Sequence, residues 1–115
     1  MSSRIERALV DLIGKVRSHY GSRAGSIYRI DRAANMEETD GSDAEIVVLL
    51  ADGSWRTLDE QRALGKLTFE ALMEHDVYIR AWPIAQAAWE EASLAEHPAL
   101  VREFRSHARR ILVPA

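Results

Sequence analysis

Two carboxylates at the start of a β-type segment are the residues of this chain that could do chemistry. Asp43 and Glu45 lie two positions apart and lead straight into the aliphatic run Ile46 to Leu50. Because side chains alternate between the faces of a strand, both carboxylates should point to one side. Such a pair can hold Mg²⁺ or Mn²⁺ against the phosphates of a nucleotide. The spacing alone also fits two solvated acidic residues at a strand edge, so both interpretations stay open.

Helical spacing of apolar residues predicts four helices around this motif. They run from about Ser3 to Tyr20, Thr57 to His75, Ala85 to Leu94 and Pro98 to Arg110. Ser3 with Glu6 has the spacing of a capping box, and Gly21 is placed to close the first helix. A second capping box is predicted at Thr57 and Glu60.

Three strands are predicted between these helices. Ser26 to Arg32 alternates like a short strand, and the acidic stretch Asn35 to Ser42 follows it as a polar loop. Glu45 to Leu50 is so densely aliphatic that it indicates a buried central strand with both faces covered. Val77 to Trp82 is the third strand, and we expect Pro83 to end it because proline cannot donate to a ladder.

Length and composition set the class of protein. With 115 residues, 47% hydrophobic and 29% charged, the chain is expected to form one domain over residues 1–115. The order of elements predicts an α+β fold in which a small mixed sheet of about three to four strands is packed by helices. A net charge of -3 argues against a nucleic-acid partner. The longest apolar run is too short to cross a bilayer, so no membrane association and a cytoplasmic location are expected.

The motif Ser42-Asp43-Ala44-Glu45 and the tail of the chain carry a family resemblance. The tail elements are Trp82-Pro83-Ile84, Trp89, His97 to Val101 and Ile111-Leu112. Together they resemble the minimal nucleotidyltransferases of the polymerase-beta superfamily, whose signature is a strand, G-S-x-A-x-G, a short loop, and S-D-x-D opening the next strand. Glu45 stands in the place of the second aspartate. The resemblance covers nearly the whole chain and implies a nucleotidyltransferase-like fold.

The family's first motif is degenerate here. Gly21-Ser22-Arg23-Ala24 spells it, but this stretch directly follows a helix and lies too far before Ser42. Counting back from Ser42 by the family's spacing places the glycine and serine positions at Asp31 and Arg32. Two like charges about 4 Å apart repel by roughly 4 kcal/mol at an effective dielectric of about 20, so Asp31 would oppose a nearby phosphate. Arg32 could compensate by pairing with Asp31 or with phosphate.

The third carboxylate of the family falls at Asp76 or at the position of Tyr78, and the residues do not decide between them. Arg80 follows Tyr78 on the same strand face, where it would oppose a metal or bind phosphate. The resemblance thus implies catalytic roles for Asp43 and Glu45, nucleotide contacts from Arg32 and Ser42, and a metal held by Asp43, Glu45 and Asp76.

The resemblance implies transfer of a nucleotide from an ATP-like donor to a protein hydroxyl, with Mg²⁺ or Mn²⁺. It also implies an antitoxin-like role beside a HEPN-type helical toxin. A second hypothesis is a catalytically inactive member of the fold that acts as a binding or dimerisation module, because the first motif is degenerate. A third is an unrelated α+β domain. Three tryptophans and a strongly apolar central strand in a small domain are compatible with a homo-oligomer, in which an edge or face is buried against a second copy, but the sequence alone does not decide this.

Overall fold

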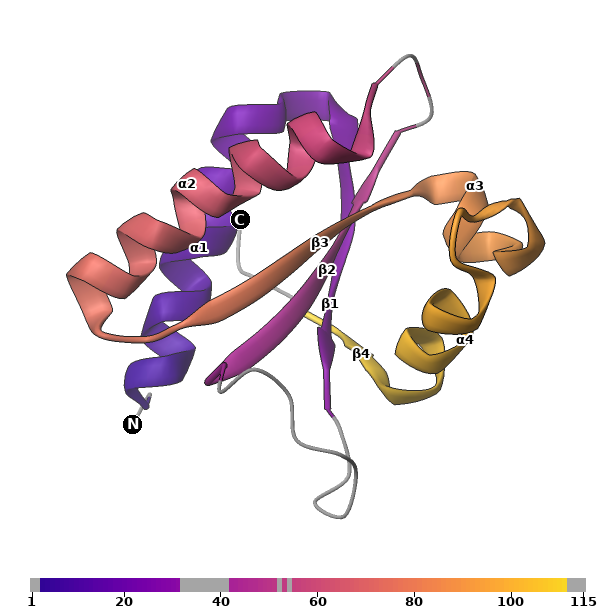
Figure 1. Cartoon of the computed structure of the whole chain (residues 1–115). Coiled ribbons are helices and arrows are strands. Elements are labelled where there is room, and N and C mark those ends of the chain that lie inside the picture. The colour runs from indigo at the N-terminus through magenta and orange to yellow at the C-terminus, as the bar shows by residue number, and fades with distance from the viewer. Residues whose placement is uncertain (1–2, 32–41, 52, 54, 112–115) are drawn as a thin grey trace.

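The computed structural model describes residues 3–31, 42–51, 53 and 55–111, and its core is a four-stranded sheet (Figure 1). The helices are α1 (Arg4–Tyr20), α2 (Thr57–His75), α3 (Gln86–Glu90) and α4 (Pro98–His107), with 3₁₀ turns at Gly21–Arg23 and Ala92–Leu94. The strands are β1 (Ala24–Ile30), β2 (Ala44–Leu50), β3 (Ile79–Ala85) and β4 (Ala108–Arg110). The sheet order is β3-β2-β1-β4, in which β2 and β3 are parallel and the other pairs antiparallel. The predicted α+β class with a mixed sheet is confirmed.

Helices cover both faces of the sheet. Every residue of β2 is buried, which confirms the predicted central strand. Alternate β2 side chains pack with α1 and α2 on one face, including Ile46, Val48 and Leu50. The others, Val47 and Leu49, pack on the second face with residues of α3 and α4. Figure 1 shows the same two layers of helices. We call these the α1–α2 face and the α3–α4 face.

The first capping box is confirmed and the second is wrong. Ser3 Oγ accepts the Glu6 amide at 3.1 Å, and Gly21 closes α1 with φ of 59°. At the start of α2 the N-cap residue is Arg56, whose side chain makes no cap hydrogen bond. Thr57 is the first residue of the helix rather than its cap, and it donates its hydroxyl to Glu96 Oε1 at 3.3 Å.

The C-terminal third differs from the sequence prediction in three ways. Strand β3 continues through Pro83 to Ala85. This is possible because β3 is an edge strand, where proline is tolerated although it has no N–H to donate to a neighbouring strand. The segment Ala85 to Leu94 forms α3 and a 3₁₀ turn rather than one helix. The last helix ends at His107, and the next three residues form β4, which pairs with the open edge of β1.

The bounds of β1 and the lengths of the helices can also be compared with the predictions. Strand β1 begins and ends two residues earlier than predicted, and Arg32 and the loop up to Gly41 lie outside the described residues. None of the helices in the described part of the chain is long and apolar enough to cross a membrane.

Candidate functional site

Asp43 lies just before β2 and joins it to β3. Its Oδ2 accepts the Tyr78 amide at 2.9 Å, and its own amide donates to the Tyr78 carbonyl at 2.8 Å. The residue is exposed. These two bonds fix the entry of β2 against the entry of β3. Asp43, for which the resemblance implies a catalytic role, thus also makes a structural contact between the two strands.

Glu45 is buried, with 7% of its surface exposed, on the α3–α4 face. Its Oε2 accepts a 2.6 Å hydrogen bond from Trp82 Nε1. Arg80 is the register partner of Glu45 on β3, and its guanidinium lies 4.6 Å from the centre of the Trp82 ring. A buried carboxylate is stable only when it is hydrogen-bonded or charge-compensated. Trp82 supplies that bond, and Arg80 is the neighbouring positive charge.

Asp76 is placed differently from the other two carboxylates. It ends α2 in the left-handed conformation, with φ of 56°, and its side chain is 88% exposed. Its Oδ2 lies 3.7 Å from Arg4 Nη1. Within the described residues, the carboxylates of Asp43, Glu45 and Asp76 do not form a group whose oxygens all lie within 4.8 Å.

The donor set can be compared with what a metal needs. Mg²⁺ takes oxygen ligands in near-ideal octahedral geometry. Asp43 and Glu45 share one end of β2, but one oxygen of each already accepts a protein N–H, and Arg80 stands beside Glu45. Ser42, half-buried, precedes them directly. The contacts of these residues are those expected of side chains that hold two strands together, more than those of a magnesium site. The metal remains a prediction.

The negative charge of Asp31 is compensated on the other face of the sheet. Its two oxygens lie 3.5 Å from Arg29 Nε and 3.1 Å from Arg109 Nε. Arg29 pairs in register with Arg109 and with Ile46, which puts both arginines on the α1–α2 face. Glu45 lies on the opposite face. Asp31 therefore holds β4 beside β1.

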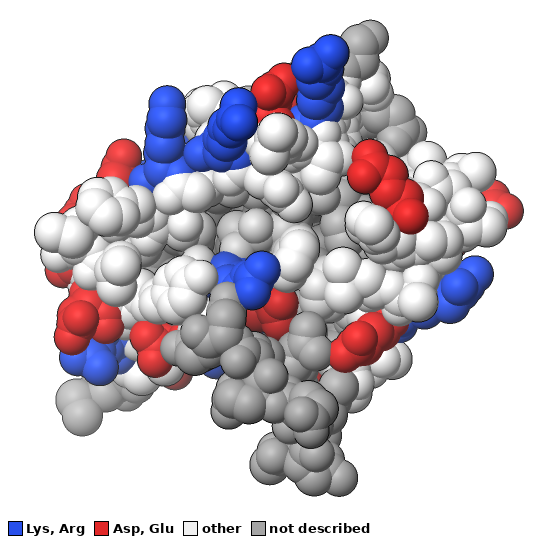
Figure 2. Space-filling view, in the orientation of Figure 1, with Lys and Arg blue, Asp and Glu red and all other residues white. Residues whose placement is uncertain are grey.

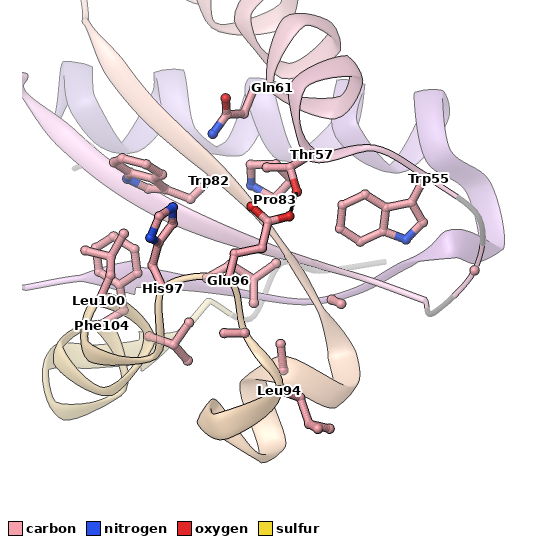
Figure 3. A pocket seen from close by; sticks show the side chains of 16 residues that line it. Trp55, Thr57, Gln61, Trp82, Pro83, Leu94, Glu96, His97, Leu100 and Phe104 are labelled. Carbon is pink, nitrogen blue, oxygen red and sulfur yellow. Dashed lines mark hydrogen bonds between the residues drawn. The ribbon is translucent and has the colours of Figure 1, made fainter.

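A pocket of about 320 Å³ lies beside the C-terminal half of β3, and sequence analysis did not find it (Figure 3). Its wall is mostly apolar and includes Trp55, Trp82 and Pro83. Its polar side chains are Thr57, Gln61, Glu96 and His97. Figure 2 shows a group of acidic atoms surrounded by uncharged ones near the place where α2, β3 and α3 meet. The signal in the sequence was the pair Trp55 and Trp82, which pattern alone does not distinguish from core residues.

A group of titratable side chains joins α1 to α2 on the surface. One ligand atom each from Asp11, Glu74 and His75 lies within 4.8 Å of the others. Lys15 Nζ lies 2.8 Å from Glu74 and 3.2 Å from Glu70. The hydrogen bond from His75, 3.1 Å long, lowers the pKa of Asp11, and Glu74 and Glu70 raise the pKa of Lys15. Since the Lys15 ammonium lies within ion-pair distance of Asp11, Glu70 and Glu74, the cluster is an ion-pair network between helices.

Comparisons with known proteins do not show a family for this chain. No family model matches this chain, and no solved structure matches it. A stretch of 77 residues, 67% of the chain, is 29% identical to an isoleucine–tRNA ligase of Prochlorococcus marinus (strain MIT 9211). The match covers 7% of that protein, so the chain spans a small part of its relative's length. The nucleotidyltransferase family therefore remains a resemblance.

Proposed function

We propose that this chain is a nucleotidyltransferase-like domain that acts as a binding module and transfers no nucleotide. The observation that carries this proposal is the Glu45 carboxylate, buried on the α3–α4 face and bonded to Trp82 at 2.6 Å beside Arg80. In the resemblance this residue would be a metal ligand.

The strength of these contacts supports the proposal. A hydrogen bond to a charged group contributes about 1.5–3 kcal/mol to stability. For Glu45 to turn that oxygen toward a metal, it would have to give up the Trp82 bond in a nearly closed environment. Asp43 would likewise give up the Tyr78 amide if it used the same oxygen. Both carboxylates thus serve to hold β3 beside β2.

A metal-dependent nucleotidyltransferase is the second candidate. What favours it is that Asp43 is exposed and directly precedes the strand that carries Glu45, at the end of β2 where the resemblance expects the site. Under this candidate, Asp43 and Glu45 would hold Mg²⁺ or Mn²⁺ against an ATP-like donor. A HEPN-type helical partner and a homo-oligomer remain predictions under both candidates.

Calorimetric titration with ATP and Mn²⁺ separates the two. We expect no binding to the wild-type chain up to about 1 mM nucleotide. Asp43→Asn is the test variant, and Asp59→Asn is its matched control, because Asp59 is an exposed carboxylate in the first turn of α2. Metal-dependent binding that disappears in Asp43→Asn and persists in Asp59→Asn would contradict the proposal and support the transferase.

A further inference from the structure

We propose that the pocket beside β3 binds a small aromatic amine, whose ring packs against the tryptophan-lined wall and whose ammonium meets Glu96. This inference rests on the proposed function, because it says what the binding module binds. The shape of the pocket, its charge and the way Trp82 is held all support it.

The shape of the pocket suits one flat ring system. Its volume of about 320 Å³ is at the lower end of the range for small-molecule sites. In Figure 3, Trp82, Leu100 and Phe104 lie on one side of Pro83, and Trp55 lies on the other. Pro83 lines the pocket and has no N–H, so at this position the edge of β3 offers a ligand no amide donor. Such a wall gains most from burying an apolar ring.

The charge of the pocket selects an amine over an anion. Glu96 is acidic, and no lysine or arginine is among the described residues that line the pocket. A phosphate or carboxylate would therefore meet a negative charge with no Lys or Arg to offset it. Glu96 accepts the Thr57 hydroxyl at 3.3 Å, and a carboxylate can accept about four hydrogen bonds, so it retains capacity for an ammonium. Figure 3 shows the Thr57–Glu96 contact next to Pro83, between the two sides of the pocket.

Trp82 is held in place before any ligand arrives. Its indole nitrogen donates to Glu45 at 2.6 Å, and its ring lies 5.5 Å from Phe104 and 4.6 Å from the Arg80 guanidinium. A wall that is already ordered loses less conformational entropy on binding. Glu45 is thus a positioning residue for this pocket. It acts through Trp82 and does not itself line the pocket.

The test is a nuclear magnetic resonance titration of the full ¹⁵N-labelled chain, in which the three tryptophan indole N–H signals are followed. The probe is tryptamine, and indole-3-acetate is the anionic control with the same ring. We expect saturable shifts of the Trp55 and Trp82 signals, and at least about tenfold weaker binding of indole-3-acetate. The Trp89 signal should stay unchanged, because Trp89 lies against Tyr28, 4.9 Å away, and does not line the pocket. Absence of saturable shifts, or equal affinity for the anion, would overturn the inference.

Variants test the two assigned side chains. Glu96→Gln should weaken tryptamine about 5- to 10-fold, as expected when an ion pair of about 1 kcal/mol is lost. The matched control is Glu91→Gln, an exposed residue nearby that does not line the pocket, and it should bind as the wild type does. Unchanged affinity in Glu96→Gln would overturn the role of Glu96. Glu45→Ala should weaken tryptamine and move the Trp82 signal of the free protein, and Glu45→Gln, which keeps an acceptor, should restore both.

The same titration includes ATP with Mg²⁺ as a separate arm, because Mg²⁺ is diamagnetic and leaves the signals sharp. Binding of ATP that needs Asp43 would contradict the proposed function, whatever tryptamine does. Failure of tryptamine to bind, with no binding of ATP, would overturn the pocket inference and leave the proposed function standing.

Discussion

The two faces of the sheet are built differently. On the α1–α2 face, the buried cluster is entirely apolar, and the charged network around Lys15 lies at the surface between the helices. On the α3–α4 face, a buried carboxylate, Glu45, is bonded to Trp82, and beside it a pocket opens at the β3 edge of the sheet, where α4 comes close to the start of α2. The buried cluster on the first face contains no charged side chain, whereas the second face has the carboxylate of Glu45 buried in it.

This difference indicates where the molecule would meet a ligand. A buried charge and an open pocket both lower stability relative to a filled apolar core. The α1–α2 face has the larger buried apolar cluster and should therefore contribute more to the free energy of folding, and the α3–α4 side has the features that suit binding.

The largest expected effect is on the α1–α2 face. Leu12 is fully buried there, and Leu12→Ala should lower the free energy of unfolding by about 3 kcal/mol, because it removes packed methyl groups and leaves a cavity. Leu100 is half-buried at the pocket, and Leu100→Ala should cost only about 1 kcal/mol, since the site is already open. Urea unfolding of both variants measures the difference. Equal losses would mean that the two faces are packed alike.

The next effect concerns the buried carboxylate. Glu45→Ala should lower the free energy of unfolding by about 2 kcal/mol, because it leaves the Trp82 N–H without its acceptor. Glu45→Gln keeps an acceptor oxygen and should lose less than about 1 kcal/mol. Thermal and urea unfolding of the pair give the comparison. A Glu45→Gln variant as unstable as Glu45→Ala would show that the charge, and not the hydrogen bond to Trp82, stabilises this face.

A smaller effect is expected where β4 joins the sheet. Asp31→Ala removes the ion pairs to Arg29 and Arg109 and should lower stability by about 0.5–1 kcal/mol, since the side chain of Asp31 is 46% exposed. The loss should shrink in about 1 M salt, where charges are screened within about 3 Å. Unfolding curves at low and high salt check this. A loss that is unchanged by salt would point to the backbone of β4 instead of the charges.

Local patterns predicted most of the secondary structure. Helical periodicity and the Ser3 cap gave α1, and the aliphatic run gave β2, because these signals lie within one element. The end of α4 was missed because Ala108 to Arg110 continue a helical spacing, and only the open edge of β1 makes them a strand. The passage of β3 through Pro83 likewise depends on its edge position in the sheet.

The candidate site was predictable only in part. Alternation placed Glu45 and Arg80 in the right region, and the structure makes them register partners. Which groups bond to these residues depends on contacts between distant segments. Trp82 donates a hydrogen bond to Glu45, which lies 37 positions earlier in the chain. Asp31 forms an ion pair with Arg109, which lies near the C-terminal end. The pocket is built from four separate stretches, so no single motif marks it.

The smallest effect is the pH dependence of the network on the α1–α2 face. The hydrogen bond from His75 holds the pKa of Asp11 below its usual value of 3.8. The stabilisation is therefore fully present above about pH 4 and is lost as the pH falls through the pKa of the folded state. Asp11→Asn should lower stability at pH 6 by about 0.5 kcal/mol, because the Asp11 side chain is 38% exposed and solvent screens its charge.

Urea unfolding of wild type and Asp11→Asn at several pH values between about 2 and 6 tests this prediction. The two curves of stability against pH should converge at the acid end. The control is Asp59→Asn, since Asp59 lies outside the network around Lys15. Curves that stay parallel down to the lowest pH would mean that Asp11 contributes through the shape of its side chain and not through its charge. The hydrogen bond between His75 and Asp11 would then add no charge-dependent stability to the apolar packing of the α1–α2 face.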